Sequence, residues 1–218
     1  MANNYKAILF DLDGTLLDTL EDLTDSMNSA LKAAGLPQHN PERYKYFIGA
    51  GVRNLVCDAL PPEMRTPENI EKFRLAMRAE YKNRWNKKSR PFPGVEEMLD
   101  KLAASGLRFA VLSNKVDDLT KMVISSLLPK WIFEVVFGER LGVPIKPNPA
   151  AAFEIVKIMN LKPGDFLYLG DGEADMKTAR AAGIFACGVL WGYRTADELK
   201  AAGAQVLVST PAEVLSLI

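Results

Sequence analysis

Two aspartates, Asp11 and Asp13, stand two residues apart directly after an apolar run at residues 7–10. If this run is a strand and its geometry persists, both carboxylates point to the same side of the chain. One could attack phosphorus as a nucleophile, while the other protonates the leaving oxygen and later activates water. Gly14 permits a sharp turn here, and Thr15 can offer a hydroxyl to the phosphate. The alternative is that such a pair only turns the chain or caps a helix.

A second acidic pair, Asp171 and Asp175, follows the apolar stretch 166–169. The two residues are four apart and can face a common cation if a helix begins near Asp175. Oxygen ligands without a nearby histidine or cysteine favour Mg²⁺ over zinc or copper. Alternatively, these acids cap a helix that begins near Glu173, where negative charge is favourable. The role of Glu173 itself stays open.

A site of this kind needs cations, because several carboxylates would surround a phosphate. Two like charges about 4 Å apart repel by roughly 4 kcal/mol at an effective dielectric constant of about 20. Besides Mg²⁺, the best candidate is Lys146, which has prolines at positions 147 and 149. Prolines stiffen the backbone and suit a positive charge held in place. The alternative is a solvated loop lysine.

Two polar residues, Ser113 and Asn114, end the apolar stretch 107–112. In a parallel sheet this end would lie beside Asp11. The serine hydroxyl and the backbone amides could then bind phosphoryl oxygens. Equally, these residues could form the N-cap of a helix that begins near Val116.

Short apolar stretches that alternate with helical patterns would position these residues. The predicted helices include 95–102, with apolar residues at i, i+3, i+4 and i+7, and 150–159. This alternation predicts an α/β fold with a Rossmann-like parallel sheet core covered on both faces. The predicted strands are 7–10, 107–112, 132–137, 166–169, 184–190 and 205–208.

The part of the chain at 17–89 breaks this alternation. It contains no convincing strand, but two apolar series lie at helical spacing over residues 16–31 and 70–81. We therefore expect a small helical domain inserted at 17–89, with a core domain formed by 1–16 and 90–218. The Pro-Phe-Pro-Gly sequence that starts at Pro91 would form the return hinge.

Composition narrows the partners and the compartment. The 27 basic and 27 acidic residues balance, so no strong field would hold nucleic acid or an anionic membrane. No run approaches the roughly 18 apolar residues of a membrane helix, and the N-terminal apolar run is too short for a signal peptide. We expect a cytoplasmic protein, either a monomer or a homodimer.

The scarcity of cysteine and histidine excludes several chemistries. Cys57 and Cys187 match no zinc or CxxC spacing, so we interpret both as buried packing residues in a reducing compartment. The single histidine, His39, lies in a polar stretch and is interpreted as a surface loop residue. Serine hydrolase triads and histidine-rich metal sites are therefore disfavoured.

In their order along the chain, these motifs resemble those of the haloacid dehalogenase superfamily of phosphohydrolases, over nearly the whole chain. The matching residues are Asp11-Leu12-Asp13-Gly14-Thr15, Ser113, Lys146, and Gly170-Asp171 with Asp175. By this resemblance Asp11 is the nucleophile and Asp13 the general acid/base, while Ser113 and Lys146 bind phosphate. The resemblance also implies a Mg²⁺ ion held by Asp11, the Asp13 backbone carbonyl and Asp171, with Asp175 in support.

The sequence departs from the family pattern at one position, and the resemblance also bears on the reaction and on the inserted helices. Gly172 stands where the family usually has threonine or serine, which weakens the match little. Members that dehalogenate lack the acid/base aspartate, so Asp13 disfavours that reaction. The helical insertion resembles the family's small cap, which closes over the site and selects the substrate. Arg53, in a cap loop similar to those that reach the leaving group, could bind a carboxylate or a second phosphate, or could be a surface arginine.

Two features bear on the substrate. Residues 63–90 carry nine basic and four acidic side chains. This excess of basic residues is either a solvated helix face or a means of steering an anionic substrate to the site. The segment 188–194 and the helix expected after it resemble the phosphoglycolate phosphatase branch. The predicted function is a Mg²⁺-dependent phosphatase for a small phosphorylated metabolite, with 2-phosphoglycolate as first choice, acting through an aspartyl phosphate. The alternatives are a pyrophosphatase, a sugar-phosphate phosphatase or phosphomutase, and a non-catalytic sensor of phosphorylated ligands.

Overall fold

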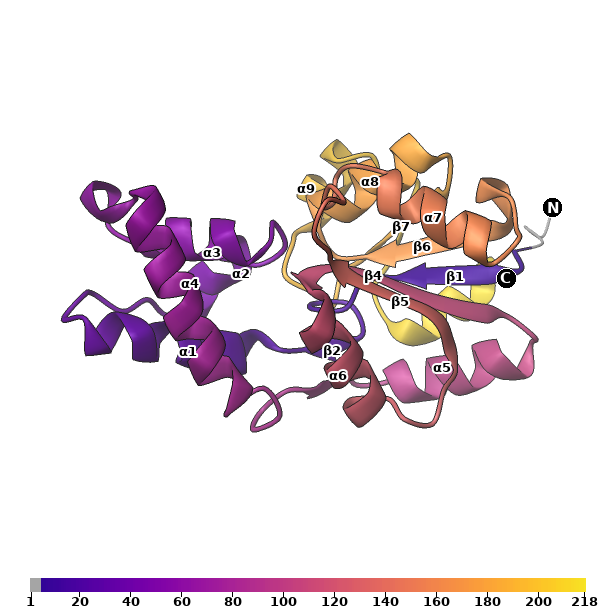
Figure 1. Cartoon of the computed structure of the whole chain (residues 1–218). Coiled ribbons are helices and arrows are strands. Elements are labelled where there is room, and N and C mark those ends of the chain that lie inside the picture. Colours follow the sequence, from indigo (N-terminus) through magenta and orange to yellow (C-terminus); the bar gives the residue numbers. More distant parts are fainter. Residues whose placement is uncertain (1–4) are drawn as a thin grey trace.

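The computed structural model describes residues 5–218, and their main feature is a six-stranded parallel sheet (Figure 1). The strand order β5-β4-β1-β6-β7-β8 puts β1 in the middle, between β4 and β6. All six predicted strands are present, and the predicted α/β class is confirmed. The strands are β1 (Ala7–Phe10), β4 (Arg108–Val116), β5 (Phe133–Glu139), β6 (Phe166–Gly170), β7 (Phe185–Val189) and β8 (Val206–Val208).

Helices cover both faces of the sheet, because alternate strand residues point to opposite sides. Ile8 and Phe10 of β1 pack into one apolar core, and Ala7 and Leu9 pack into the other. The first core includes residues of α5, α6 and a C-terminal 3₁₀ helix, and the second includes residues of α7, α8 and α9 (Figure 1). These helices are α5 (Val95–Ala104), α6 (Asp117–Leu127), α7 (Ala150–Ile158), α8 (Glu173–Ala182), α9 (Ala196–Ala201) and the 3₁₀ helix Pro211–Leu217.

Four further helices, which we call the cap, form a separate cluster beside the carboxyl edge of the sheet (Figure 1). They are α1 (Leu20–Ala33), α2 (Pro41–Phe47), α3 (Val52–Ala59) and α4 (Pro67–Lys82). Asn40 and Thr66 cap α2 and α4, each followed by a proline at the first helical position. Apolar residues of all four helices share one core, and Leu119 of α6 and Tyr193 join it from the sheet domain.

The two chain segments that join the cap to the sheet lie side by side. They form a short antiparallel ribbon of β2 (Leu17–Asp18) and β3 (Arg90–Pro91). The carboxylate of Asp22 reinforces it, because Oδ2 accepts hydrogen bonds from the Lys88 N–H, the Ser89 N–H and the Ser89 hydroxyl at 3.0, 2.8 and 2.7 Å. The prediction of no strand in this region missed the ribbon, since two-residue strands carry no periodic pattern.

Both cysteines are free, but only Cys187 is buried; Cys57 is half-buried, so its interpretation as a buried residue was wrong. His39 lies in a loop, where its Nε2 is 2.8 Å from the Ala59 carbonyl oxygen and its ring contacts Phe47. Within residues 5–218, no helix has both the length and the apolar character needed to cross a membrane.

Candidate active site

The predicted site residues meet at the carboxyl edge of the sheet, facing the cap. Asp11 follows β1, Ser113 lies on the neighbouring strand β4, and Asp171 follows β6 on the other side. Lys146 comes from the loop between β5 and α7. This edge of an open parallel sheet is where such folds place their ligands.

Lys146 joins two of the predicted carboxylates. Its ammonium nitrogen lies 2.7 Å from Oδ1 of Asp11 and 2.6 Å from Oδ1 of Asp175, and it also donates to the Leu112 carbonyl at 2.9 Å. Lys146 is only 4% exposed, so the interpretation as a solvated loop lysine is wrong. The three donors of one ammonium group are therefore used inside the site.

Burial alone would lower the pKa of Lys146, but the charges of Asp11 and Asp175 raise it well above its usual value. The lysine is therefore positively charged. Burial, followed by the charge of Asp175, raises the pKa of Asp11, and Lys146 opposes this only in part. One lysine thus offsets only part of the cost of burying the ionised nucleophile candidate.

Asp171 is held in place by hydrogen bonds to both oxygens. The Thr15 hydroxyl donates to Oδ1 at 3.1 Å, and the Tyr193 N–H donates to Oδ2 at 2.9 Å. Gly14 and Gly192 pack directly against the carboxylate, since an added Cβ would lie 2.3 and 2.2 Å from Asp171 atoms. The hydroxyl of Thr15, expected to serve the phosphate, therefore orients Asp171 instead.

Three buried carboxylates, those of Asp11, Asp171 and Asp175, form a group suited to a divalent cation. Their candidate ligand oxygens lie within 4.8 Å of one another. Burial and the charge of Asp175 raise the pKa of Asp171 to about 7, which shows how poorly the charge is balanced. An all-oxygen set with excess negative charge fits Mg²⁺. The Asp13 carboxylate is not part of this group, and the resemblance implies that only its backbone carbonyl contributes.

Asp13 instead pairs with a residue that the sequence reasoning missed. Lys115 Nζ lies 2.7 Å from Asp13 Oδ1, which also accepts a 2.6 Å hydrogen bond from the Thr19 hydroxyl. Within residues 5–218, Oδ2 has no hydrogen-bond partner, so it remains available for proton transfer. The ammonium of Lys115 also lies over the Tyr81 ring of α4, 4.7 Å from its centre. Its position two residues after Ser113, on the same side of a strand, was the available signal.

Ser113 and Asn114 lie inside β4, which continues to Val116 with an irregular register after Leu112. The N-cap of α6 is Val116, with no side-chain cap, so the alternative role of these residues as a helix cap is wrong. The Ser113 oxygen accepts a hydrogen bond from the Lys115 N–H at 3.1 Å, which leaves the hydroxyl proton available for a phosphoryl oxygen.

The Asn114 side chain connects the core to the cap. Its Oδ1 accepts from the Lys146 N–H at 2.9 Å, and its Nδ2 donates to the carbonyls of Lys146 and Gly49 at 3.0 and 2.9 Å. Gly49 belongs to the loop between α2 and α3. Only the backbone of Asn114, and not its fully engaged amide, could bind a phosphate.

Asp175 forms the predicted cap of α8 and also lies among the buried carboxylates. Its Oδ2 accepts from the Gly172 N–H at 3.0 Å as part of the α8 N-terminus, while Oδ1 contacts Lys146 and accepts from the Tyr168 hydroxyl at 3.1 Å. Gly172 supplies only its backbone, consistent with the small effect expected from its departure from the family pattern. Glu173 pairs with Lys177 on the exposed side of α8.

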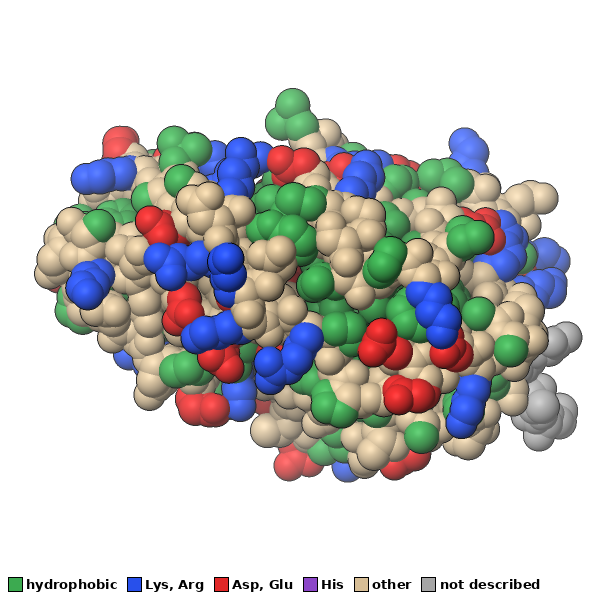
Figure 2. Space-filling model, turned by 90° about the horizontal axis from the view of Figure 1, so that it is seen from below, with side chains coloured by type: hydrophobic (Ala, Val, Ile, Leu, Met, Phe, Trp, Pro, Cys, Tyr) green, Lys and Arg blue, Asp and Glu red, His purple; other side chains and the backbone are tan. Residues whose placement is uncertain are grey.

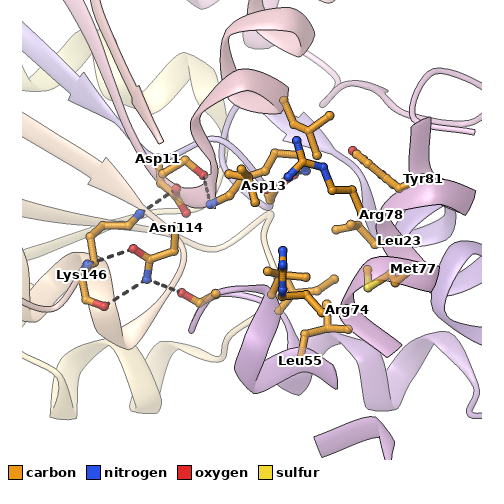
Figure 3. A pocket seen from close by; sticks show the side chains of 18 residues that line it. Asp11, Asp13, Leu23, Leu55, Arg74, Met77, Arg78, Tyr81, Asn114 and Lys146 are labelled. Carbon is orange, nitrogen blue, oxygen red and sulfur yellow. Dashed lines mark hydrogen bonds and ion pairs between the residues drawn. The ribbon is translucent and has the colours of Figure 1, made fainter. Parts of the chain in front are cut away.

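The cap contributes two arginines that the sequence reasoning did not single out. Arg74 and Arg78 of α4 line the cavity between the cap and Asp11 (Figure 3), whereas Arg53 is exposed and lies outside the residues that line it. Figure 2 shows basic and acidic side chains close together over the cap. Several basic residues of the 63–90 segment are paired in this way, including Arg74 with Glu71.

Comparisons with known proteins agree with this geometry. The haloacid dehalogenase-like hydrolase family model matches residues 8–189. Phosphoglycolate phosphatases of Aquifex aeolicus and Chromobacterium violaceum are 32% and 30% identical, covering 86% and 99% of this chain and 86% and 97% of their own. A solved structure of a "predicted phosphoglycolate phosphatase" from Haemophilus somnus has a TM-score of 0.91 at 29% identity and covers 98% of each chain.

The fold and the edge-of-sheet site define an α/β protein of the hydrolase class with an inserted helical cap. The chain belongs to the haloacid dehalogenase-like hydrolase family. The family resemblance inferred from the motifs is therefore confirmed. The names of the relatives also agree with the expected class of enzyme, the phosphoric monoester hydrolases.

Proposed function

We propose that the protein is a Mg²⁺-dependent phosphatase that transfers the phosphoryl group of a small phosphate monoester to Asp11 and then to water. The observation that carries this proposal is the convergence of Asp11, Lys146 and two further buried carboxylates at one point. Mg²⁺ held by Asp11, Asp171 and the Asp13 backbone carbonyl, with Asp175 in support, would offset their charge and that of the phosphate.

The chain's own residues account for the remaining steps. Asp11 attacks phosphorus through the carboxylate oxygen that Lys146 does not occupy, while Lys146 and the Ser113 hydroxyl balance charge on the phosphoryl oxygens. Asp13 protonates the leaving oxygen through Oδ2 and later takes a proton from the water that attacks the aspartyl phosphate. Lys115 and Thr19 fix its other oxygen and so orient it.

Among the substrates that the names of relatives suggest, 2-phosphoglycolate is the first candidate, because several relatives about 30% identical over most of this chain are named for it. A pyrophosphate or a sugar phosphate is the alternative within the family. A non-catalytic sensor needs neither a free nucleophile oxygen nor an oriented proton donor, so the arrangement of Asp11 and Asp13 disfavours it. We also propose a cytoplasmic enzyme with a small phosphorylated metabolite as its partner.

Phosphate release from a panel of small phosphate esters, measured with Mg²⁺ and with a chelator, tests the proposal. We expect Mg²⁺-dependent turnover of at least one monoester, with free alcohol as the product. Phosphoryl return to a sugar would identify a phosphomutase. No phosphate release from any ester would support the sensor instead.

A further inference from the structure

The cavity that starts at Asp11 and Asp13 continues well into the cap (Figure 3). Leu23 of α1, Leu55 of α3 and Met77 of α4 line its cap side, so its walls there are largely apolar. Asp13, the proposed acid for the leaving oxygen, lines this cavity and also a second cavity that contains Asp171 and Asp175. Because the second cavity holds the acidic group suited to the metal, the apolar cavity is the better fit for the leaving group of a phosphate at Asp11.

Three side chains of α4 that carry polar groups also line this cavity: Arg74, Arg78 and Tyr81 (Figure 3). Arg74 uses Nε and one terminal nitrogen in a fork on Glu71. Arg78 uses a single terminal nitrogen on Asp118 of α6, at 2.6 Å. Within residues 5–218, the other guanidinium nitrogens have no hydrogen-bond partner.

Tyr81 lines the cavity but is not a free donor. The residue is only 2% exposed, and the Lys115 ammonium lies beside it, over its ring. The unpaired guanidinium nitrogens of Arg74 and Arg78 therefore remain as the donors of α4 in this cavity, and they suit an acceptor with negative charge.

We propose that the preferred substrate is a phosphate monoester whose leaving group has an apolar body and a terminal carboxylate, with the body against Leu55 and Met77 and the carboxylate at Arg78. This inference rests on the proposed phosphatase function. In such a series 2-phosphoglycolate is the shortest member, with one methylene between its ester oxygen and its carboxylate. Each further buried methylene should raise kcat/KM about fourfold.

Four esters separate the two recognition elements. Ethyl phosphate has neither a large body nor an anion, 2-phosphoglycolate has the anion, benzyl phosphate has the body, and para-carboxybenzyl phosphate has both. Their alkyl or benzyl leaving groups avoid the activated phenolic leaving group of aryl esters. We expect kcat/KM with Mg²⁺ for para-carboxybenzyl phosphate to exceed each of the others by about tenfold or more.

A matched pair of variants assigns the carboxylate preference to Arg78. In Arg78→Gln, the kcat/KM ratio of para-carboxybenzyl to benzyl phosphate should fall about tenfold. Asp118→Asn removes the same ion pair between cap and core but keeps the guanidinium, so this ratio should persist. The comparison separates anion recognition from loss of the ion pair.

Clear outcomes would overturn the inference. It is wrong if 2-phosphoglycolate has the highest kcat/KM, or if the carboxylate makes no difference between the two benzyl esters. An equal loss of the ratio in both variants would also remove Arg78 as the recognition residue. Absence of turnover for every ester with Mg²⁺ would refute the proposed function itself, and this inference with it.

Discussion

The ammonium nitrogen of Lys146 lies 2.7 Å from a carboxylate oxygen of Asp11, although 135 residues separate the two in the chain. The contact exists because the loop before α7 returns to the carboxyl edge of the sheet beside β1. Lys146 is also within 2.6 Å of Asp175. A single buried charge therefore connects the proposed nucleophile to the acidic group on the other side of the site.

We expect Lys146→Met to lower kcat by roughly 10²- to 10³-fold, the usual effect of losing one group that stabilises transition-state charge. Methionine keeps the length of the side chain but leaves two buried carboxylates unpaired. Steady-state kinetics with Mg²⁺ measure the effect. Lys130→Met, which removes an exposed lysine paired with Asp100, is the control and should retain parental kcat. Equal kcat in both variants would contradict this role for Lys146.

The stabilisation by Mg²⁺ should depend on pH. Without metal, burial and Asp175 raise the pKa of Asp171 from 3.8 to about 7. The folded protein then binds more protons than the unfolded chain between these values, so the contribution of Asp171 to stability falls as pH rises. Mg²⁺ binding requires the ionised carboxylate and reverses this loss.

Thermal unfolding in EDTA and in MgCl₂ measures this effect. We expect the rise in Tm caused by Mg²⁺ to be large near about pH 8 and small near about pH 5, since protons compete with the metal. In Asp171→Asn the increase should be small at both pH values. A parental increase that is the same at both would contradict this assignment of Asp171.

Asp13→Asn should lower kcat by about 10²- to 10⁴-fold for alkyl phosphates, because the amide cannot protonate the leaving oxygen. The defect in the first transfer should be smaller for para-nitrophenyl phosphate, whose leaving group departs without a proton. Burst measurements of nitrophenol release follow this step. An equal defect in alkyl and nitrophenyl ester cleavage would argue against Asp13 as the general acid.

Arg194 connects the core to the end of α2 and the loop after it through hydrogen bonds. Its guanidinium donates to the carbonyls of Lys45 and Ile48, the latter at 3.1 Å. Arg194→Gln should therefore favour an open cap and speed hydrogen exchange in residues 46–52 by about tenfold. Arg180→Gln, on α8, is the control and should leave exchange there unchanged. Parental exchange in the Arg194 variant would contradict its role in holding the loop.

The ribbon between cap and core predicts a stability effect. Asp22→Ala leaves the N–H groups of Lys88 and Ser89 and the Ser89 hydroxyl without their acceptor, so we expect a loss of roughly 1–3 kcal/mol in the free energy of unfolding. Asp25→Ala removes only an exposed ion pair with Lys88 and should cost less than about 1 kcal/mol. Urea unfolding compares the two; equal losses would contradict the special role of Asp22.

Much of the fold was predictable because its strands and helices carry clear periodicity. The apolar run 7–10 predicts β1 correctly, and the spacing of apolar residues over 95–102 predicts α5. The ribbon of residues 17–18 and 90–91 was not predictable in this way. Its stability comes from pairing between distant segments and from Asp22, and neither leaves a local pattern.

The site residues, like the fold, could be predicted from the sequence only in part. Asp11, Asp171 and Lys146 were identified because charged residues directly follow buried strands or lie in a proline-stiffened loop. Contacts across the cap could not be predicted from local sequence. Arg78, which lines the cavity, carries no motif, and its position depends on how the cap packs against the sheet. Lys115, which pairs with Asp13 within the sheet domain, was missed although its spacing from Ser113 was a signal.

The central claim is that Asp11 accepts the phosphoryl group, and trapping the acyl phosphate tests it most directly. Enzyme turning over its best ester with Mg²⁺ is quenched in acid and treated with borohydride, which reduces an acyl phosphate to an alcohol. Peptide mass analysis should find Asp11 converted to homoserine, with Asp13 unchanged, and Asp11→Asn should show neither conversion nor turnover. Conversion at another residue, or parental turnover by Asp11→Asn, would contradict the proposed mechanism.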